Sequence, residues 1–186
     1  MKDYPLAKVF QLLEPGPTVL VTTARKGKAN VMTMSWHMMM EFEPPLVACL
    51  LSGNNYSFEA LSKTRECVIA IPTVELAEKV VDVGNCSGRD VDKFAAIGLT
   101  PRPAKLVKAP LVAECYANLE CRVADDALVD KYNLFILEVL KAWVDPKQFG
   151  PRRPARTLHH NGDGTFRVAG ETLNLKKRMV KWTQFT

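Results

Sequence analysis

The pattern of apolar and polar positions predicts a chain built mainly of β-strands. Short, β-branched apolar segments occur at residues 18–24, 29–36, 44–51 and 66–72, and two longer ones follow at 111–126 and 132–145. The first two stand at hairpin spacing around Gly27. Strands joined by hairpins and short helices, without regular β-α-β alternation, predict an antiparallel barrel of about six strands.

Segments with helical spacing of apolar residues lie before and between these strands, at 6–14, 57–64, 74–84 and 91–98. Ser57 stands where a helix N-cap is expected, and Gly84 and Gly98 stand where helices end. Residues 146–166 read as an extended, loop-rich arm with a turn at N-G-D-G. We therefore expect a single domain over residues 1–186, whose basic C-terminal extension covers 146–186.

The stretch K-A-N-V-M-T-M-S-W-H-M-M-M, residues 28–40, places five methionines around Trp36. Read as one strand over 30–41, it carries Asn30, Met32, Met34, Trp36, Met38 and Met40 on one face, and Val31, Thr33, Ser35, His37, Met39 and Glu41 on the other. Methionine specifies a core poorly, whereas thioethers and an indole suit a flat aromatic ligand or an adaptable interface. Periodicity alone does not decide whether this stretch packs in the core or forms a ligand site.

Groups suited to a phosphate follow this stretch. Hydroxyl and amide side chains gather at the start of the predicted helix over 57–64: Ser52, Asn54, Tyr56 and Ser57. A helix start of this kind can bind a phosphate dianion, although an ordinary capped helix has the same pattern. Arg89 and Lys93 add cations that could neutralise the same phosphate, but would otherwise be read as solvated surface. A strand rich in thioether side chains, a polar helix start and two cations together fit flavin mononucleotide (FMN).

The segments GKANVMTMSW, PPLVACLL, NNYSFEAL and SGRDVDKFAAIGLTP, in this order, resemble the flavin reductase-like family of FMN-binding split barrels. The resemblance runs from about residue 15 to 145 and is nearest to the flavoredoxins, small FMN electron carriers. It implies a Greek-key split β-barrel with short flanking helices. It also implies an isoalloxazine ring lined by Asn30, Met32, Thr33, Met34, Ser35 and Trp36. The phosphate would then lie near Ser52, Asn54, Tyr56 and Ser57, with Arg89 and Lys93 beside it.

The late-strand motif of the family differs in this chain. Many flavin reductases of the family carry G-D-H there, with the histidine approaching the nicotinamide. Here Tyr132 takes that place within V-D-K-Y-N-L-F-I-L-E-V, and a phenol cannot act as a cation near neutral pH. The resemblance therefore favours a flavoredoxin-like carrier that works with a redox partner protein. An NAD(P)H:flavin oxidoreductase is the alternative, with NADH or NADPH as its donor.

The net charge of +5 is concentrated at the C-terminal end, where residues 146–186 hold nine lysines and arginines against two acidic residues. A basic segment can bind nucleic acid, but no nucleic-acid motif accompanies it, so a nucleic-acid-binding module is a remote alternative. The family resemblance implies a homodimer in which residues 146–166 wrap the partner. His159 and His160 lie in this arm. They are expected in a surface turn, in the site or at a subunit interface, and the sequence does not decide among the three.

Cysteine usage and the lack of membrane or export signals indicate the cytoplasm. The five cysteines form no C-x-x-C pair, and we expect reduced, mostly buried thiols, with Cys86 the most exposed. We expect no structural zinc site, since the ligand spacings that such sites use are missing. No apolar run is long enough to cross a bilayer, and the N-terminal residues do not read as a secretory signal.

Overall fold

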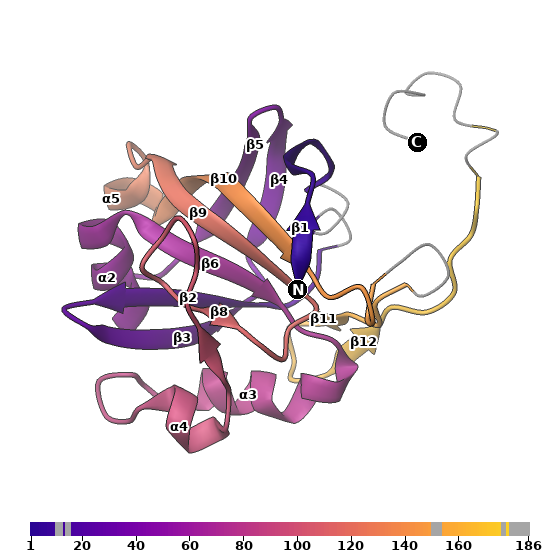
Figure 1. Cartoon of the computed structure of the whole chain (residues 1–186). Helices are drawn as coiled ribbons and strands as arrows, with labels where there is room; N and C mark the ends of the chain where they lie inside the picture. Colours follow the sequence, from indigo (N-terminus) through magenta and orange to yellow (C-terminus); the bar gives the residue numbers. More distant parts are fainter. Residues whose placement is uncertain (10–12, 14–15, 150–153, 176–177, 179–186) are drawn as a thin grey trace.

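An antiparallel sheet of eight strands, bent into a barrel, forms the body of the molecule (Figure 1). The computed structural model describes residues 1–9, 13, 16–149, 154–175 and 178. The strands are β1 (Lys2–Tyr4), β2 (Val19–Arg25), β3 (Lys28–Met34), β4 (His37–Phe42), β5 (Pro45–Leu50), β6 (Glu66–Ile71), β9 (Ala117–Asp125) and β10 (Leu134–Val144). Their order is β3-β2-β6-β9-β10-β5-β4, and β1 pairs with β10. All six predicted strands are present, and β1 and β4 add to them.

The methionine-rich stretch is divided between two strands, so the prediction of one continuous strand over 30–41 is wrong. β3 ends at Met34 and pairs with β2, whereas β4 begins at His37 and pairs with β5. These two strands are consecutive in the chain but stand at opposite ends of the sheet order. The predicted alternation does hold within β3, because Met34 packs in the barrel interior and Val31 packs against the opposite face.

Two hydrophobic clusters fill the two sides of this sheet. The first lies inside the barrel and includes Leu119, Phe135 and Leu137, each almost fully buried. The second lies between the sheet and the helices α3 (Ala77–Asn85) and α4 (Lys93–Ile97), which cover its lower face in Figure 1. Each fully buried aliphatic or aromatic side chain contributes about 1.5–3 kcal/mol, so the strands stay paired chiefly through these clusters.

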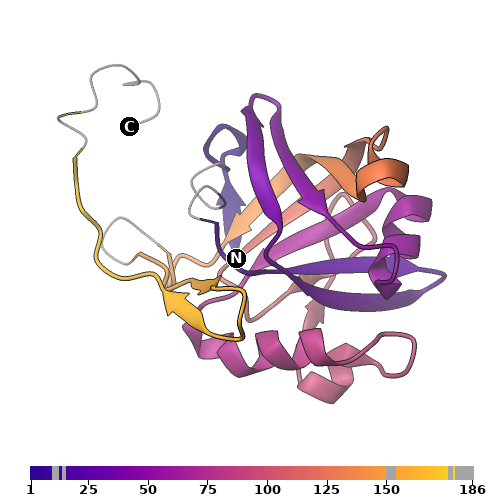
Figure 2. The ribbon, with the colours of Figure 1, turned by 180° about the vertical axis from the view of Figure 1, so that it is seen from behind.

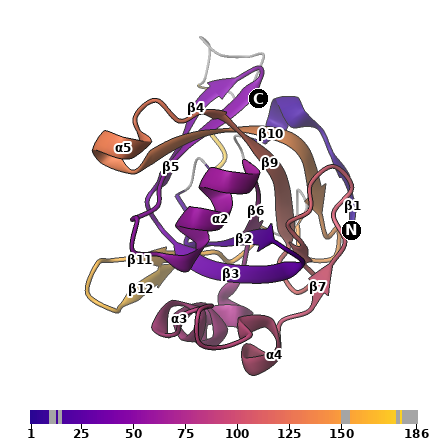
Figure 3. The ribbon, with the colours of Figure 1, turned by 90° about the vertical axis from the view of Figure 1, so that its left-hand side faces the viewer.

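The helices follow the predictions with several corrections. α2 (Tyr56–Thr64) lies across one end of the barrel (Figure 3), but its N-cap is Asn55 and not Ser57. The predicted helix over 74–84 forms as η2 (Val74–Leu76) and α3, which runs one residue past Gly84. A short helix, α5 (Val129–Tyr132), stands where the last strand was expected to begin.

α4 agrees with its prediction, since Gly98 ends it in a left-handed conformation at φ 68°. Of the predicted helix over 6–14, η1 (Leu6–Lys8) is 3₁₀-helical, and residues 10–12 and 14–15 lie outside the described residues. The predicted strand over 111–126 is interrupted, because β8 (Leu111–Val112) pairs with β7 (Pro101–Arg102) before β9 begins. Within the described residues, no helix combines the length and apolar character that crossing a membrane requires.

Part of the predicted arm is an ordered hairpin. β11 (Leu158–His160) and β12 (Phe166–Val168) pair with each other and lie beside the barrel (Figure 2). The backbone N–H of Thr18 donates to the Leu158 carbonyl at 2.7 Å, and that of Val74 donates to the Arg156 carbonyl at 2.8 Å. The Leu158 side chain is buried in the second cluster. The hairpin of the extension therefore packs on its own chain.

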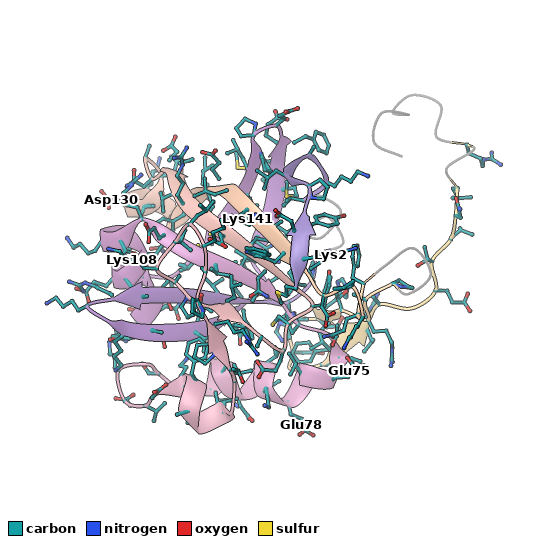
Figure 4. The ribbon with its side chains drawn as sticks, in the orientation of Figure 1. Lys2, Glu75, Glu78, Lys108, Asp130 and Lys141 are labelled. Atoms are coloured by element: carbon teal, nitrogen blue, oxygen red, sulfur yellow. The ribbon has the colours of Figure 1, made fainter. Side chains whose placement is uncertain are left out.

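Charged side chains lie mostly on the outside, as Lys2, Glu75, Glu78, Lys108 and Asp130 do in Figure 4. Among the described residues, Lys93 and Glu120 are the buried exceptions, and Glu120 on β9 is fully buried. Its carboxylate accepts hydrogen bonds from the backbone N–H groups of Lys105 and Leu106 and from Trp143 Nε1 at 2.7 Å. A buried carboxylate is tolerated when donors surround it in this way, and here it fastens the loop before β8 to the sheet.

Candidate functional site

A pocket of about 380 Å³ opens where the chain passes from β3 to β4. It is lined by Met32, Thr33, Met34, Ser35 and Trp36 on this segment, and by Leu50, Ser52, Asn55, Tyr132 and Asn133 from other elements. Five of the six residues predicted to line a flavin ring thus line one pocket. Asn30, the sixth, lies further back along β3.

The walls of the pocket are apolar and partly open. Trp36 is 71% exposed, and Leu50 stands at the same rim. The Leu50 backbone N–H donates to the Trp36 carbonyl at 3.0 Å, which holds the crossing segment against β5. Ser35 and Trp36 belong to neither strand, and their own N–H groups donate to no carbonyl of the described residues. Within the described part of the chain, these two backbone donors at the rim therefore have no carbonyl acceptor.

Thr33 and His37 hold the crossing segment from either side. The Thr33 hydroxyl donates to the Val80 carbonyl of α3 at 2.6 Å, so this residue of the pocket wall is tied to α3. His37 Nε2 lies 2.7 Å from the Pro17 carbonyl, while Nδ1 is buried and has no hydrogen-bond partner among the described residues. Burial lowers the pKa of His37 below its ordinary value of 6.5. A neutral imidazole that donates through Nε2 therefore fits this place.

A polar cluster joins β3 to the first turn of α2. Asn30 and Ser57 are both buried, and Asn30 Nδ2 donates to Ser57 Oγ at 2.8 Å. This bond explains why Ser57 is not a cap, because its hydroxyl faces the sheet. Tyr56 lies beside them, with the Arg89 guanidinium carbon 5.7 Å from its ring centroid.

The loop before α2 carries the other predicted polar residues. Asn54 is exposed, and its carbonyl accepts a hydrogen bond from Arg89 Nη1 at 3.1 Å. Ser52 Oγ accepts a bond from the Asn54 backbone N–H at 3.3 Å. The structure thus brings together the predicted phosphate residues of α2, its preceding loop and Arg89.

Lys93 is not part of this group. Its side chain is buried, and Nζ donates to the Val83 carbonyl in α3 at 2.7 Å. Burial lowers its pKa, and the bond gives a carbonyl of the last turn of α3 its partner. A lysine so engaged serves α3 and not the loop before α2.

Lys28 is a cation that the sequence interpretation missed. Its Nζ donates to the Gly88 carbonyl at 2.9 Å and lies 5.4 Å from the Tyr56 ring centroid. Beside Gly27 in a predicted hairpin it resembles an ordinary turn residue. The available signal was its spacing, because residues 28, 30 and 32 share one face of a strand.

Tyr132 is the last residue of α5 and does not lie on a late strand. Its side chain is exposed at the mouth of the pocket, beside Asn133.

The two arm histidines do not line the pocket: His159 bonds to Thr157, and His160 packs on Phe166. All five cysteines are free, and Cys86 is the only one that is not buried. Over the described ranges, no three His, Cys, Asp or Glu side chains are grouped to hold a metal ion.

The chain is similar to a known protein family and to several known proteins. Residues 13–167 match a family model described as the flavin reductase like domain. The uncharacterized protein YddH of Escherichia coli K12 is 34% identical over 171 residues, which cover 87% of this chain and 90% of that protein.

Two solved structures extend the comparison. An FMN-binding domain of a flavin reductases-like enzyme from Shewanella baltica OS155 superposes with a TM-score of 0.88 at 32% identity, covering 93% of this chain and 96% of its own. Flavoredoxin of Desulfovibrio vulgaris (Miyazaki F) gives a TM-score of 0.78 at 25% identity, over 86% of this chain and 89% of its own.

The partly buried His37 predicts a pH-dependent stability. Its folded pKa is lowered, so the unfolded chain takes up the proton first as the pH falls below about 6.5. The stability that depends on neutral His37 is complete above that value and is lost as the pH falls toward the folded pKa. His37→Gln, which keeps a donor for Pro17, should therefore lose less unfolding free energy than the wild type between pH 7 and pH 5. Urea denaturation at both values measures this; equal losses in the two proteins would contradict it.

Proposed function

Because the chain belongs to the flavin reductase-like domain family, we propose that it is an FMN-binding redox protein of the flavoredoxin type. Family membership confirms the predicted family and its split-barrel fold. The observation that carries the proposal is the pocket at the β3–β4 crossing, which joins apolar walls to free backbone donors. The protein would hold the flavin non-covalently and pass electrons through it to or from a partner protein.

The residues of the pocket fit a flavin ring. A flat, polarizable ring needs apolar surfaces on its faces and hydrogen-bond donors along its polar edge. Met32, Met34 and Trp36 provide apolar surface, and the N–H groups of Ser35 and Trp36 provide donors. The S. baltica structure is described as an FMN-binding domain and matches nearly the whole of this chain, which supports FMN as the ligand.

When bound, the flavin supplies the exchange of electrons, and the surrounding residues set its potential. Fixed N–H donors stabilise negative charge at the edge that they face, which favours the reduced form. The thioether side chains of Met32 and Met34 offer no charge, and this apolar wall favours the oxidised form. The side chain of Tyr132 at the mouth is a phenol, which cannot act as a cation toward a nicotinamide. This supports a protein donor over direct oxidation of NAD(P)H.

A second copy of the chain is proposed to cover the open side of the pocket. Trp36, Met38, Met40 and Phe42 are exposed large apolar side chains at alternate positions on and just before the edge strand β4, and Leu50 of β5 is exposed beside them. Figure 2 shows this hairpin projecting beyond the other strands. Exposed apolar patches of this kind mark protein interfaces. Since residues 154–158 pack on their own barrel, the proposal assigns the homodimer interface to β4 and β5.

The test of function is an anaerobic one. Protein saturated with FMN is mixed with NADH or NADPH, and flavin absorbance is followed before dithionite is added. We expect FMN to remain bound and oxidised with either nucleotide and to be reduced by dithionite. Rapid bleaching by a nicotinamide nucleotide would instead make the protein an NAD(P)H:flavin oxidoreductase. Failure to bind FMN would reject both functions.

The placement of the ring predicts the effect of Trp36→Ala. Losing one indole wall should weaken FMN binding by about tenfold, which corresponds to about 1.4 kcal/mol of aromatic contact. Trp36 is 71% exposed, so the fold should survive the change. Met38→Ala is the matched control, because Met38 is exposed on the same face but does not line the pocket. Titration of flavin fluorescence gives both affinities, and equal effects of the two changes would contradict the placement.

The proposed interface predicts the effect of charge on β4. Introducing Met38→Glu and Met40→Glu together should convert a dimer into a monomer, because two carboxylates per subunit would be forced into an apolar contact. Light scattering at micromolar concentration measures the mass. Leu106→Glu, at an exposed apolar residue outside the pocket, should leave the dimer intact. A wild-type monomer, or a charged variant that stays dimeric, would contradict the interface.

A further inference from the structure

His37 ties the crossing segment to the far side of the break in the sheet. It is the first residue of β4 and directly follows Ser35 and Trp36. Its Nε2 lies 2.7 Å from the carbonyl of Pro17, in the segment before β2. A carbonyl oxygen only accepts, so Nε2 carries the proton and donates. Since β2 and β4 lie near opposite ends of the sheet order, this bond spans the break that the crossing segment bridges.

The acceptor of this bond is itself fixed. Pro17 is buried, and its ring restricts its backbone. The N–H of Thr18, the next residue, donates to the Leu158 carbonyl at 2.7 Å. Leu158 is buried in the second cluster, so the hairpin of β11 and β12 holds this segment against the barrel. A donor bonded to a fixed acceptor cannot move freely, and His37 therefore restrains the chain that precedes it.

The restrained segment carries groups of the pocket wall. Ser35 and Trp36 line the pocket and belong to no strand. The Trp36 carbonyl accepts from the Leu50 N–H at 3.0 Å, and the Thr33 hydroxyl bonds to α3 at the other end of the segment. Two residues outside a strand ladder depend on such contacts to keep one conformation. The bond of His37 is the side-chain contact that follows them directly in the chain.

The surroundings of His37 suit a neutral imidazole. Nδ1 is buried and has no hydrogen-bond partner among the described residues. Protonation would add a second N–H at that atom and a full charge, and neither would find an acceptor there. Burial accordingly lowers the pKa of His37, although the Pro17 carbonyl opposes this effect. A charged imidazole would therefore be under pressure to leave its place, and the crossing segment would be released with it.

The neighbours of His37 do not offer a compensating charge. Cys49 is its pairing partner on β5, and burial raises the pKa of that thiol, which stays uncharged. Glu41, the acidic residue of β4, is exposed, and its carboxylate accepts the N–H of the next residue. Residues 16–18 and 34–36 contain no titratable side chain. Among these described neighbours, none would hold the proton of His37 in place.

We propose that His37 is a positioning residue for the flavin, which in its neutral form holds Ser35 and Trp36 in the binding conformation and on protonation weakens FMN binding. This inference rests on the proposed function and adds a control of affinity to it. His37 does not line the pocket, so it acts through the main chain of the crossing segment. A segment that is in place for only part of the time lowers the apparent affinity by that fraction.

The first test removes the bond and then restores it. FMN is titrated by flavin fluorescence at pH 7 against the wild type and three variants. His37→Leu should bind FMN about fivefold more weakly, the fold-change expected from one hydrogen bond. His37→Gln, whose amide N–H can reach the Pro17 carbonyl, should recover most of the loss. His160→Leu is the matched control, because His160 lies outside the pocket and accepts the Gly164 N–H, and it should leave the affinity unchanged.

The pH profile separates positioning from charge. Between pH 7 and pH 5 the wild type should lose more FMN affinity than His37→Gln, because only the wild type gains a proton at this place. The titration of the FMN phosphate affects both proteins alike. If a charged imidazole instead attracted the phosphate, the wild type would gain affinity relative to His37→Gln, which would overturn the inference. This comparison also decides the matter if His37→Leu does not fold.

Hydrogen exchange of the ligand-free protein gives a readout that does not involve flavin. The Leu50 N–H bonds to the Trp36 carbonyl and so reports the state of the crossing segment. In His37→Leu this amide should exchange faster, while the amides of β6 and β9 should keep the rates of the wild type. Equal acceleration at all these amides would mean that His37 only stabilises the fold, and would overturn the inference.

The remaining outcomes separate the inference from the function beneath it. An unchanged FMN affinity in His37→Leu, or an equal loss in His160→Leu, would overturn the role of His37. In both cases the wild type still binds FMN, so the proposed function stands. A wild type that does not bind FMN would overturn both.

Discussion

The sheet leaves β3 and β4 unpaired with each other, and the site depends on this break. The chain runs directly from one to the other, yet β3 pairs with β2 and β4 pairs with β5 at the two ends of the sheet. Residues 35 and 36 must cross between these edges, so their N–H groups lie outside any ladder. The same crossing opens the pocket and turns one apolar face of β4 outward. A barrel closed at this point would have neither the pocket nor the exposed face.

One strand carries residues of both the pocket and the polar cluster beside α2. Along β3, Met32 and Met34 border the pocket, Asn30 fastens the strand to Ser57, and Lys28 reaches the Gly88 loop. The buried bond between Asn30 and Ser57 fixes the distance between the sheet and α2. Apolar and charged ligand groups would therefore meet surfaces that are held at a constant separation, and little rearrangement would be needed to bind them.

The sequence predicted the features that depend on local pattern, such as the strands. It did not predict the features that depend on contacts between segments distant in the chain. The β-branched segments were sufficient for six strands. The family resemblance of their consecutive motif, and not the polarity pattern, assigned Met32 to Trp36 to one site, and these residues do line one pocket. The break after Met34 was not predictable, because polarity alternates through it and only the distant pairing with β5 reveals it. Ser57 was taken for a cap because the hydroxyl's true partner, Asn30, is distant in sequence. The positions of Lys93 and Lys28 were missed for the same reason, because tertiary contacts absent from local spacing place Lys93 against α3 and Lys28 beside the Gly88 carbonyl.

The hairpin of β11 and β12 gives the domain a boundary that the barrel alone does not suggest. Leu158 completes a cluster shared with Leu20 of β2 and Val80 of α3, and Thr18 at the start of β2 bonds to the Leu158 carbonyl. A fragment that stopped at the end of β10 would expose this cluster to water. The smallest unit able to fold cooperatively therefore extends to about Val168. The hairpin that follows the barrel belongs to the core of the domain.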